Sequence, residues 1–259
     1  MPAADLPLLI DAALAAGRVA AGFTGPTAKR WEKPGDAGPV TEADLAVNAS
    51  LHDQLRQARP DYGWLSEESE DDADRLAAPR VFIIDPIDGT RSFANGSRTW
   101  AHSIAVAEQG VVTAGVIYLP QRDLLFAAAA GQGATLNGAP IRSSGTRHLT
   151  SAKVLATKVN MQPEFWRGTI PQLDRSHRPS LAYRMALVAQ GRFDAMLTFR
   201  PTWEWDIAAG DLILREAGAQ VTDRNGKPLR FNNATPALNG VVAGNTVLHE
   251  QLVGAVQPN

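Results

Sequence analysis

The chain has no cysteine among its 259 residues. This absence excludes disulfides, thiolate nucleophiles and zinc sites built on thiolates. It is consistent with a reducing compartment, although secreted proteins can also lack cysteine. No apolar run approaches the ~20 residues that a membrane-spanning helix requires, and no basic residue precedes Arg18, which makes the N-terminus a poor signal peptide. We therefore expect a cytoplasmic protein.

A strong charge imbalance is also missing, since the formal net charge is −2 at pH 7. The chain offers no general attraction to a nucleic acid polymer or to an anionic membrane. Histidine is sparse, and none of the five histidines has the spacing of a metal-ligand pair. We expect all of them to be structural or surface residues: His52, His102, His148, His177 and His249.

The hydrophobic pattern of the N-terminal part predicts helices joined by a loop. Residues 6–19 are rich in alanine and leucine and favour a helix. Residues 22–38 contain several glycines and prolines and favour a loop. A second helix follows, because Val47, Leu51 and Leu55 recur at four-residue spacing and form one apolar stripe.

Farther along the chain the pattern changes to short strands. Residues 104–106, 111–118 and 124–129 are separated by turn residues and predict antiparallel hairpins. Asn137-Gly138 marks another tight turn. Beyond it, strands and helices alternate, which predicts a parallel-type α/β half. Its strands are expected at residues 154–157 and 193–199, and its helices at residues 180–190 and 205–217.

The most informative segment is Asp85-Pro86-Ile87-Asp88-Gly89-Thr90. It follows the apolar run 81–84, which predicts a buried strand, and it precedes a short helix at residues 91–94. Carboxylate oxygens are the ligands that Mg²⁺ prefers, and phosphate binds at helix N-termini. The segment therefore indicates metal-assisted phosphate chemistry. The alternative is an ordinary strand-to-helix turn, because Asp, Pro and Gly are common turn residues.

Other acidic residues stand in separate segments, as a site for several cations requires. Glu67 and Glu68 follow a short apolar stretch, and Asp206 lies at the start of a predicted helix. Asp44 lies seven residues before Leu51 on nearly the same helix face, so its carboxylate is expected to point inward. For Asp44 and Asp206 the alternative is a first-turn aspartate that only stabilises the helix dipole.

These segments together resemble the inositol monophosphatase superfamily of Mg²⁺-dependent, lithium-sensitive phosphatases. The resemblance spans Lys33 to the C-terminus, and the matching motifs stand in family order. They are Lys33 with Val40 to Asp44, Ser66-Glu67-Glu68, Asp85 to Thr90, Trp205 to Ala209 with Glu216-Ala217-Gly218, and Ala243-Gly244-Asn245.

The resemblance implies an α/β (α+β) fold, a layered α-β-α-β-α sandwich of the inositol monophosphatase and fructose-bisphosphatase type. We expect an N-terminal α+β half at residues 1–135 that carries most metal ligands. A C-terminal α/β half at residues 136–259 would contribute Asp206 and the substrate pocket. The oligomeric state stays open, a homodimer included.

The resemblance also implies a role for each site residue. Two or three Mg²⁺ ions would be held by the side chains of Glu67, Asp85, Asp88 and Asp206 and by the backbone carbonyl of Ile87. Asp44 and Thr90 would orient the attacking water, and Glu68 would support the site as a further catalytic residue. The backbone amides of Gly89 and Thr90 would receive the phosphate oxygens.

The reaction is expected to be hydrolysis of a small phosphate ester by metal-activated water. Arg91-Ser92-Phe93 and the segment Arg200 to Asp206 resemble the bacterial 3′(2′),5′-bisphosphate nucleotidases, which convert adenosine 3′,5′-bisphosphate to AMP. Inositol-1-monophosphatase is the alternative; histidinol-phosphate phosphatase, fructose-1,6-bisphosphatase and a non-catalytic metal-binding regulator are less favoured. The candidate substrate-binding side chains beyond the metal motif are Arg91, Arg184, Arg200 and Trp205.

Overall fold

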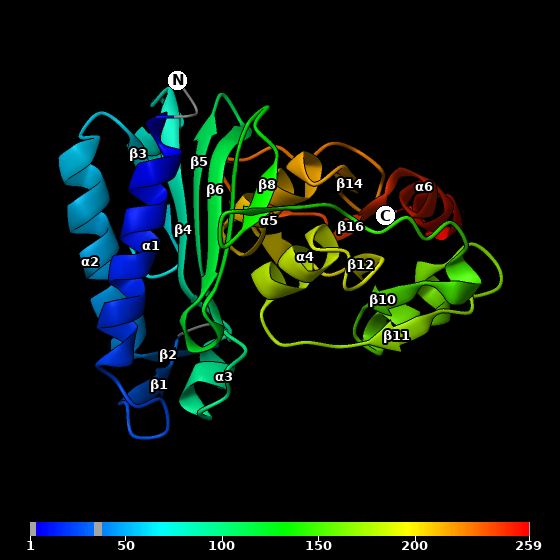
Figure 1. Ribbon diagram of the computed structural model, residues 1–259, viewed down its shortest axis with the longest axis horizontal. Coiled ribbons are helices and arrows are strands. Elements are labelled where there is room, and N and C mark those ends of the chain that lie inside the picture. Colours follow the sequence, from blue (N-terminus) through cyan, green and yellow to red (C-terminus); the bar gives the residue numbers. More distant parts are fainter. Residues whose placement is uncertain (1–3, 34–37, 259) are drawn as a thin grey trace.

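The computed structural model describes residues 4–33 and 38–258. Helices and sheets lie in alternating layers in the order α-β-α-β-α (Figure 1), which confirms the predicted sandwich. None of the helices in the described part of the chain combines the length and the hydrophobicity of a membrane span.

The first layer is a pair of helices, α1 (Leu6–Ala21) and α2 (Glu42–Ala58). They pack side by side on one face of the large sheet (Figure 1). The apolar stripe predicted for the second helix is confirmed, because Val47, Leu51 and Leu55 are fully buried in the core cluster between these helices and the sheet.

The second layer is a seven-stranded sheet in the order β3-β4-β5-β6-β7-β8-β9. Strand β3 runs parallel to β4, and every later neighbour is antiparallel, which confirms the predicted hairpins. The strands are β3 (Gly63–Ser66), β4 (Arg80–Asp88), β5 (Ala101–Glu108), β6 (Val111–Leu119), β7 (Leu124–Ala129), β8 (Ala134–Leu136) and β9 (Ala139–Ile141).

The loop predicted at residues 22–38 is wrong in part. Strand β1 (Arg30–Glu32) lies within it and pairs antiparallel with β2 (Pro39–Thr41). The strand is too short and too exposed to leave a hydrophobic period in the sequence. Residues 34–37 of the predicted loop lie outside the described residues.

The third layer consists of α4 (Leu181–Ala189) and α5 (Glu204–Glu216) and lies between two sheets. The fourth layer is a five-stranded sheet in the order β11-β10-β12-β16-β14. Its strands are β10 (Lys153–Leu155), β11 (Asp174–Ser176), β12 (Ala195–Thr198), β14 (Ala219–Thr222) and β16 (Val241–Asn245). Helix α6 (Thr246–Ala255) covers its outer face.

The expectation of a parallel-type second half is only partly correct. Strands β11, β10 and β12 are parallel, but β16 runs antiparallel to both β12 and β14. Local alternation of strands and helices does not determine the direction of the final strand. The division expected at residue 135 stays a prediction; that residue lies within β8, and the seven-stranded sheet extends to Ile141.

Several shorter elements join the layers. Helix α3 (Thr90–Ala94) follows β4 directly, and β13 (Thr202–Trp203), which pairs with β15 (Ala237–Leu238), leads into α5. The single-turn 3₁₀ segment η3 (Ala73–Leu76) precedes β4. The elements that carry candidate ligands are thus the end of β4 and the start of α5, which pack against each other.

Candidate active site

Three predicted metal ligands meet where β4 ends and α5 begins. One carboxylate oxygen from each of Asp85, Asp88 and Asp206 lies within 4.8 Å of the other two. Asp85 and Asp88 are buried, and Asp206 is half-buried. Two aspartates from a strand end and one from a helix more than a hundred residues away therefore form one cluster.

Close packing brings α5 to this position. A Cβ atom on Gly115 of β6 would lie 3.1 Å from the Cα of Ala209, so a side chain there would push the helix backbone away from the sheet by a few tenths of an ångström. On the other side, a Cβ on Gly210 would lie 2.6 Å from the sulfur of Met185. The small, apolar face of α5 thus directs Asp206 towards the end of β4.

In the described part of the chain none of the three aspartates forms an ion pair, although the charges of Arg184 and Arg200 act on Asp88 and Asp206 from a distance. Burial raises the pKa of Asp85 well above its usual value, and repulsion from Glu67, Asp88 and Asp206 raises it further. Burial, followed by the charges of Asp88 and Glu67, also raises the pKa of Asp206. The buried Oδ1 of Asp85 has no hydrogen-bond partner among the described residues. An orphaned carboxylate oxygen in an acidic cluster fits a cation ligand site.

Asp88 has a structural function as well. Its Oδ2 accepts hydrogen bonds from the Ser180 hydroxyl (2.7 Å) and the Ala182 N–H (2.6 Å) at the start of α4. These bonds oppose the effect of burial, which nevertheless raises the pKa of Asp88. Sequence reasoning missed this contact, although it had placed the start of α4 at Ser180.

Thr90 and Asp44, which are predicted to orient the attacking water together, form a hydrogen bond with each other. The Thr90 Oγ1 lies 3.0 Å from Asp44 Oδ1 and 3.1 Å from the Ile87 carbonyl oxygen. The Thr41 N–H and hydroxyl donate to the other Asp44 oxygen, at 2.9 and 2.5 Å. Burial raises the pKa of Asp44 to about 6 despite these bonds. The predicted inward direction of Asp44 is confirmed by its 1% exposure.

Glu67 and Glu68 are both paired with Lys33. The ammonium nitrogen lies 2.6 Å from Glu67 and 2.9 Å from Glu68. Burial opposes the charge on Lys33, but the two carboxylates outweigh it and raise the pKa of the lysine. For Glu67, burial and the neighbouring acids outweigh the lysine and raise the pKa to about 7. Glu67 therefore acts electrostatically on the aspartate cluster while its carboxylate binds Lys33.

The predicted substrate-binding residues differ in their surroundings. Arg184 is buried and donates from Nε to the Arg178 carbonyl oxygen at 2.6 Å. Burial lowers its pKa, and the charges of Asp88 and Asp206 act in the opposite direction. Arg200 is exposed, and its charge lowers the pKa of Asp206, so it lies near the cluster. Arg91 is exposed on α3.

Two further predicted residues border the metal segment. Gly89 has φ = +98°, a left-handed conformation that favours glycine and turns the chain from β4 into α3. Trp205 stacks on the half-exposed Trp203, with ring centroids 5.0 Å apart and planes at 9°. Asp206 follows Trp205 directly in the first turn of α5.

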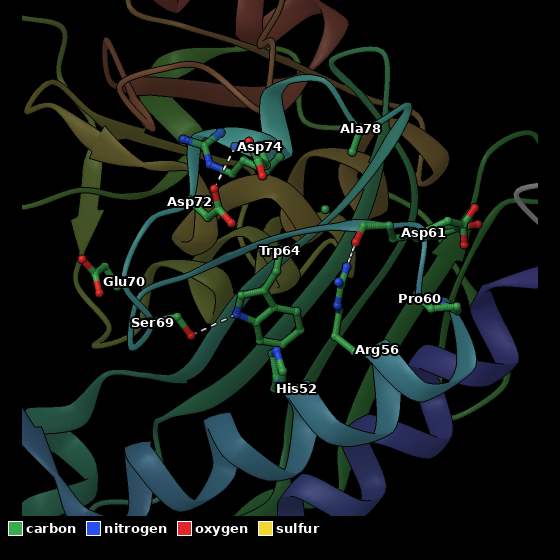
Figure 2. A pocket seen from close by; sticks show the side chains of 13 residues that line it. His52, Arg56, Pro60, Asp61, Trp64, Ser69, Glu70, Asp72, Asp74 and Ala78 are labelled. Carbon is green, nitrogen blue, oxygen red and sulfur yellow. Dashed lines mark hydrogen bonds between the residues drawn. The ribbon is translucent and has the colours of Figure 1, made fainter.

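A cavity of about 460 Å³ lies elsewhere, between α2, the start of β3 and η3 (Figure 2). The indole of Trp64 meets the imidazole of His52 edge to face, 5.0 Å between ring centroids. Glu70, Asp72 and Asp74 also line the cavity. Among the described residues that line it there is no predicted metal ligand, so we do not identify it with the active site.

The thermal stability of the metal-free protein is expected to fall as the pH rises from 6.5 to 8.5. Deprotonation of acids with raised pKa values is less favourable in the folded state than in the unfolded state, so stability decreases through this window. Glu67, with a pKa of about 7, contributes on the order of 1 kcal/mol, which lowers Tm by about 2 °C or more.

Differential scanning fluorimetry in chelator and in excess Mg²⁺ measures this effect. The Tm difference between the two conditions is expected to widen with pH, because a bound cation neutralises the acids. A difference that stays constant or narrows from pH 6.5 to 8.5 contradicts a cation site at these residues.

Comparison with known proteins agrees with the motifs and the fold. The model of the "Inositol monophosphatase family" matches residues 5–259. An inositol-1-monophosphatase from Mesorhizobium japonicum is 34% identical, covering 97% of this chain and 96% of the relative. The Nus factor SuhB of Escherichia coli is also 34% identical, with 85% of each chain covered. A Thermotoga maritima IMPase structure superposes with a TM-score of 0.83 at 30% identity, covering 98% of this chain and 96% of that one. The chain belongs to the inositol monophosphatase family.

Proposed function

We propose that the protein is a Mg²⁺-dependent phosphomonoesterase that hydrolyses a small phosphate ester with an activated water. The observation that carries this proposal is the meeting of three aspartates, one with an orphaned buried oxygen, next to the Thr90–Asp44 pair. We place the reaction in the cytoplasm, with a small molecule as the partner.

The residues present fit a hard cation, because the cluster offers carboxylate and carbonyl oxygens and, among the described residues, its aspartates form no ion pair. Mg²⁺ would be held by the side chains of Asp85, Asp88 and Asp206, by the Ile87 carbonyl and, once released from Lys33, by Glu67. When bound, Mg²⁺ would lower the pKa of a water and neutralise the phosphate charge.

The chain's own groups then position the reactants. The Thr90 hydroxyl proton points to an acceptor, Asp44 Oδ1 or the Ile87 carbonyl, so the oxygen lone pairs remain available to accept a hydrogen bond from water. Asp44 keeps the hydroxyl in this orientation and is itself fixed by Thr41. The N–H groups of Gly89 and Thr90 would bind phosphate oxygens.

Two substrate classes have specific support. Inositol 1-phosphate is supported by the name of the M. japonicum relative, which aligns over nearly its whole length. Adenosine 3′,5′-bisphosphate is supported by Arg184 and Arg200, whose charges act on the aspartate cluster and could bind a second phosphate. Arg184 would first have to exchange its bond to the Arg178 carbonyl.

A substrate comparison tests the proposal. Hydrolysis is expected to require Mg²⁺ and to stop in excess chelator, and Li⁺ at tens of millimolar, a rough scale for a weakly held ion, is expected to inhibit it. Values of kcat/KM for adenosine 3′,5′-bisphosphate, inositol 1-phosphate, fructose 1,6-bisphosphate and histidinol phosphate would identify the ester. Undiminished turnover in chelator would refute the mechanism. Absence of turnover on every ester would favour a non-catalytic metal-binding regulator.

A further inference from the structure

The metal segment interrupts the sheet with a bulge. Strands β4 and β5 pair in register up to Asp85 opposite Ser103, and pairing resumes at Asp88 opposite Ala101. Pro86 and Ile87 therefore lie opposite the single residue His102. Pro86 has no N–H and the register is broken here. The regular backbone hydrogen bonds between β4 and β5 are therefore interrupted at Pro86 and Ile87.

The His102 side chain supplies a hydrogen bond to β4 where the regular backbone pairing is interrupted. Its Nδ1 forms a hydrogen bond with the Pro86 carbonyl oxygen. The imidazole is fully buried and contacts two rings, Trp100 at 5.4 Å and Tyr118 at 6.3 Å between centroids. These ring contacts and the hydrogen bond to Pro86 restrict the orientation of the imidazole.

The position of the His102 proton follows from its partner. A carbonyl oxygen only accepts, so Nδ1 carries the hydrogen and donates it. The buried Nε2 has no partner among the described residues and is then a bare lone pair. Burial lowers the pKa of His102 to about 4, which keeps the ring neutral at pH 7.

We propose that His102 is a positioning residue of the metal centre, acting through the Pro86 carbonyl. The inference rests on the proposed function, since it assigns a purpose to the bulge only if the bulge binds a cation. The hydrogen bond fixes the peptide plane between Pro86 and Ile87. A fixed plane restricts the directions open to the Ile87 carbonyl, a candidate ligand, and to the flanking aspartates.

Three variants separate the donor from the packing. His102→Asn keeps a nitrogen donor at the place of Nδ1, whereas His102→Leu has a similar branched shape and no donor. Trp100→Phe disturbs the packing against the ring but leaves the hydrogen bond. Mg²⁺ affinity is measured by calorimetry on chelator-stripped proteins, together with Tm and with phosphatase activity.

We expect His102→Leu to weaken Mg²⁺ binding by about 10-fold or more, the range found for groups that orient metal ligands. His102→Asn and Trp100→Phe are expected to stay within about threefold of the wild type, even where Tm falls. Wild-type affinity in His102→Leu, or equal weakening by asparagine and leucine at equal Tm, would overturn the proposal. If the wild type bound no Mg²⁺ at all, the proposed function would fail with it.

A second measurement does not depend on the folding of any variant. The ¹⁵N resonances of His102 in the wild type are expected to show a protonated Nδ1 and an unprotonated Nε2 at pH 7. The opposite tautomer would leave the Pro86 carbonyl without a donor and would overturn the proposal.

Discussion

Asp206→Asn is expected to reduce turnover severely while stabilising the metal-free protein. Loss of a carboxylate ligand removes several kcal/mol of transition-state stabilisation, or about 10³-fold in kcat. The metal-free protein gains stability because asparagine removes one like charge from the cluster and can donate a hydrogen bond to Asp85. A gain of about 1 kcal/mol raises Tm by about 2–4 °C.

Asp211→Asn is the matched control. Asp211 lies on the same helix, is buried and also has a raised pKa caused by burial, but its carboxylate is paired with Arg215 at 2.9 Å. We expect this variant to lose stability and to keep kcat. Near-wild-type turnover of Asp206→Asn at saturating Mg²⁺ would show that Asp206 is not a ligand.

Asp88→Asn is expected to lose activity to a similar extent but to gain less stability. Both hydrogen bonds at the start of α4 are accepted by Asp88 Oδ2, and the neutral amide oxygen of an asparagine accepts them less strongly than a carboxylate oxygen does. Thermal unfolding of Asp88→Asn beside Asp206→Asn in chelator measures the difference. A larger Tm gain in Asp88→Asn would contradict the anchoring role of this carboxylate.

Thr90→Val is expected to slow chemistry more than it weakens binding. Valine has the shape of threonine but lacks the hydroxyl that bonds to Asp44 and would orient the attacking water. Deleting one positioned hydrogen bond raises the barrier by about 2–4 kcal/mol, which is roughly 30- to 10³-fold in kcat. The phosphate keeps its proposed contacts with the cations and with the N–H groups of Gly89 and residue 90, so KM is expected to change little.

Steady-state kinetics on the preferred ester, with Thr90→Ser as the control that keeps a hydroxyl, measure this effect. Serine is expected to retain most of kcat. A large rise in KM with kcat unchanged would assign Thr90 to substrate binding instead of water positioning.

Most of the helices and strands, and the acidic motifs, could be predicted from the sequence. The apolar stripe Val47, Leu51 and Leu55 and the hairpin strands depend on local periodicity, which the residues themselves carry. The motifs around Asp85 and Asp206 could also be identified from the sequence, because a hard cation requires carboxylate ligands in any fold. The family assignment followed from these motifs and was confirmed along the chain.

Only the tertiary structure decided which side chains contact each other and how burial shifts their pKa values. No local pattern could show that Lys33 binds Glu67 and Glu68, or that Asp88 holds the start of α4, since these contacts join segments far apart in the chain. The direction of β16 depends on the connection that returns it to the sheet. The raised pKa values depend on burial, and the role inferred for His102 depends on a break in strand register, which a linear sequence does not display.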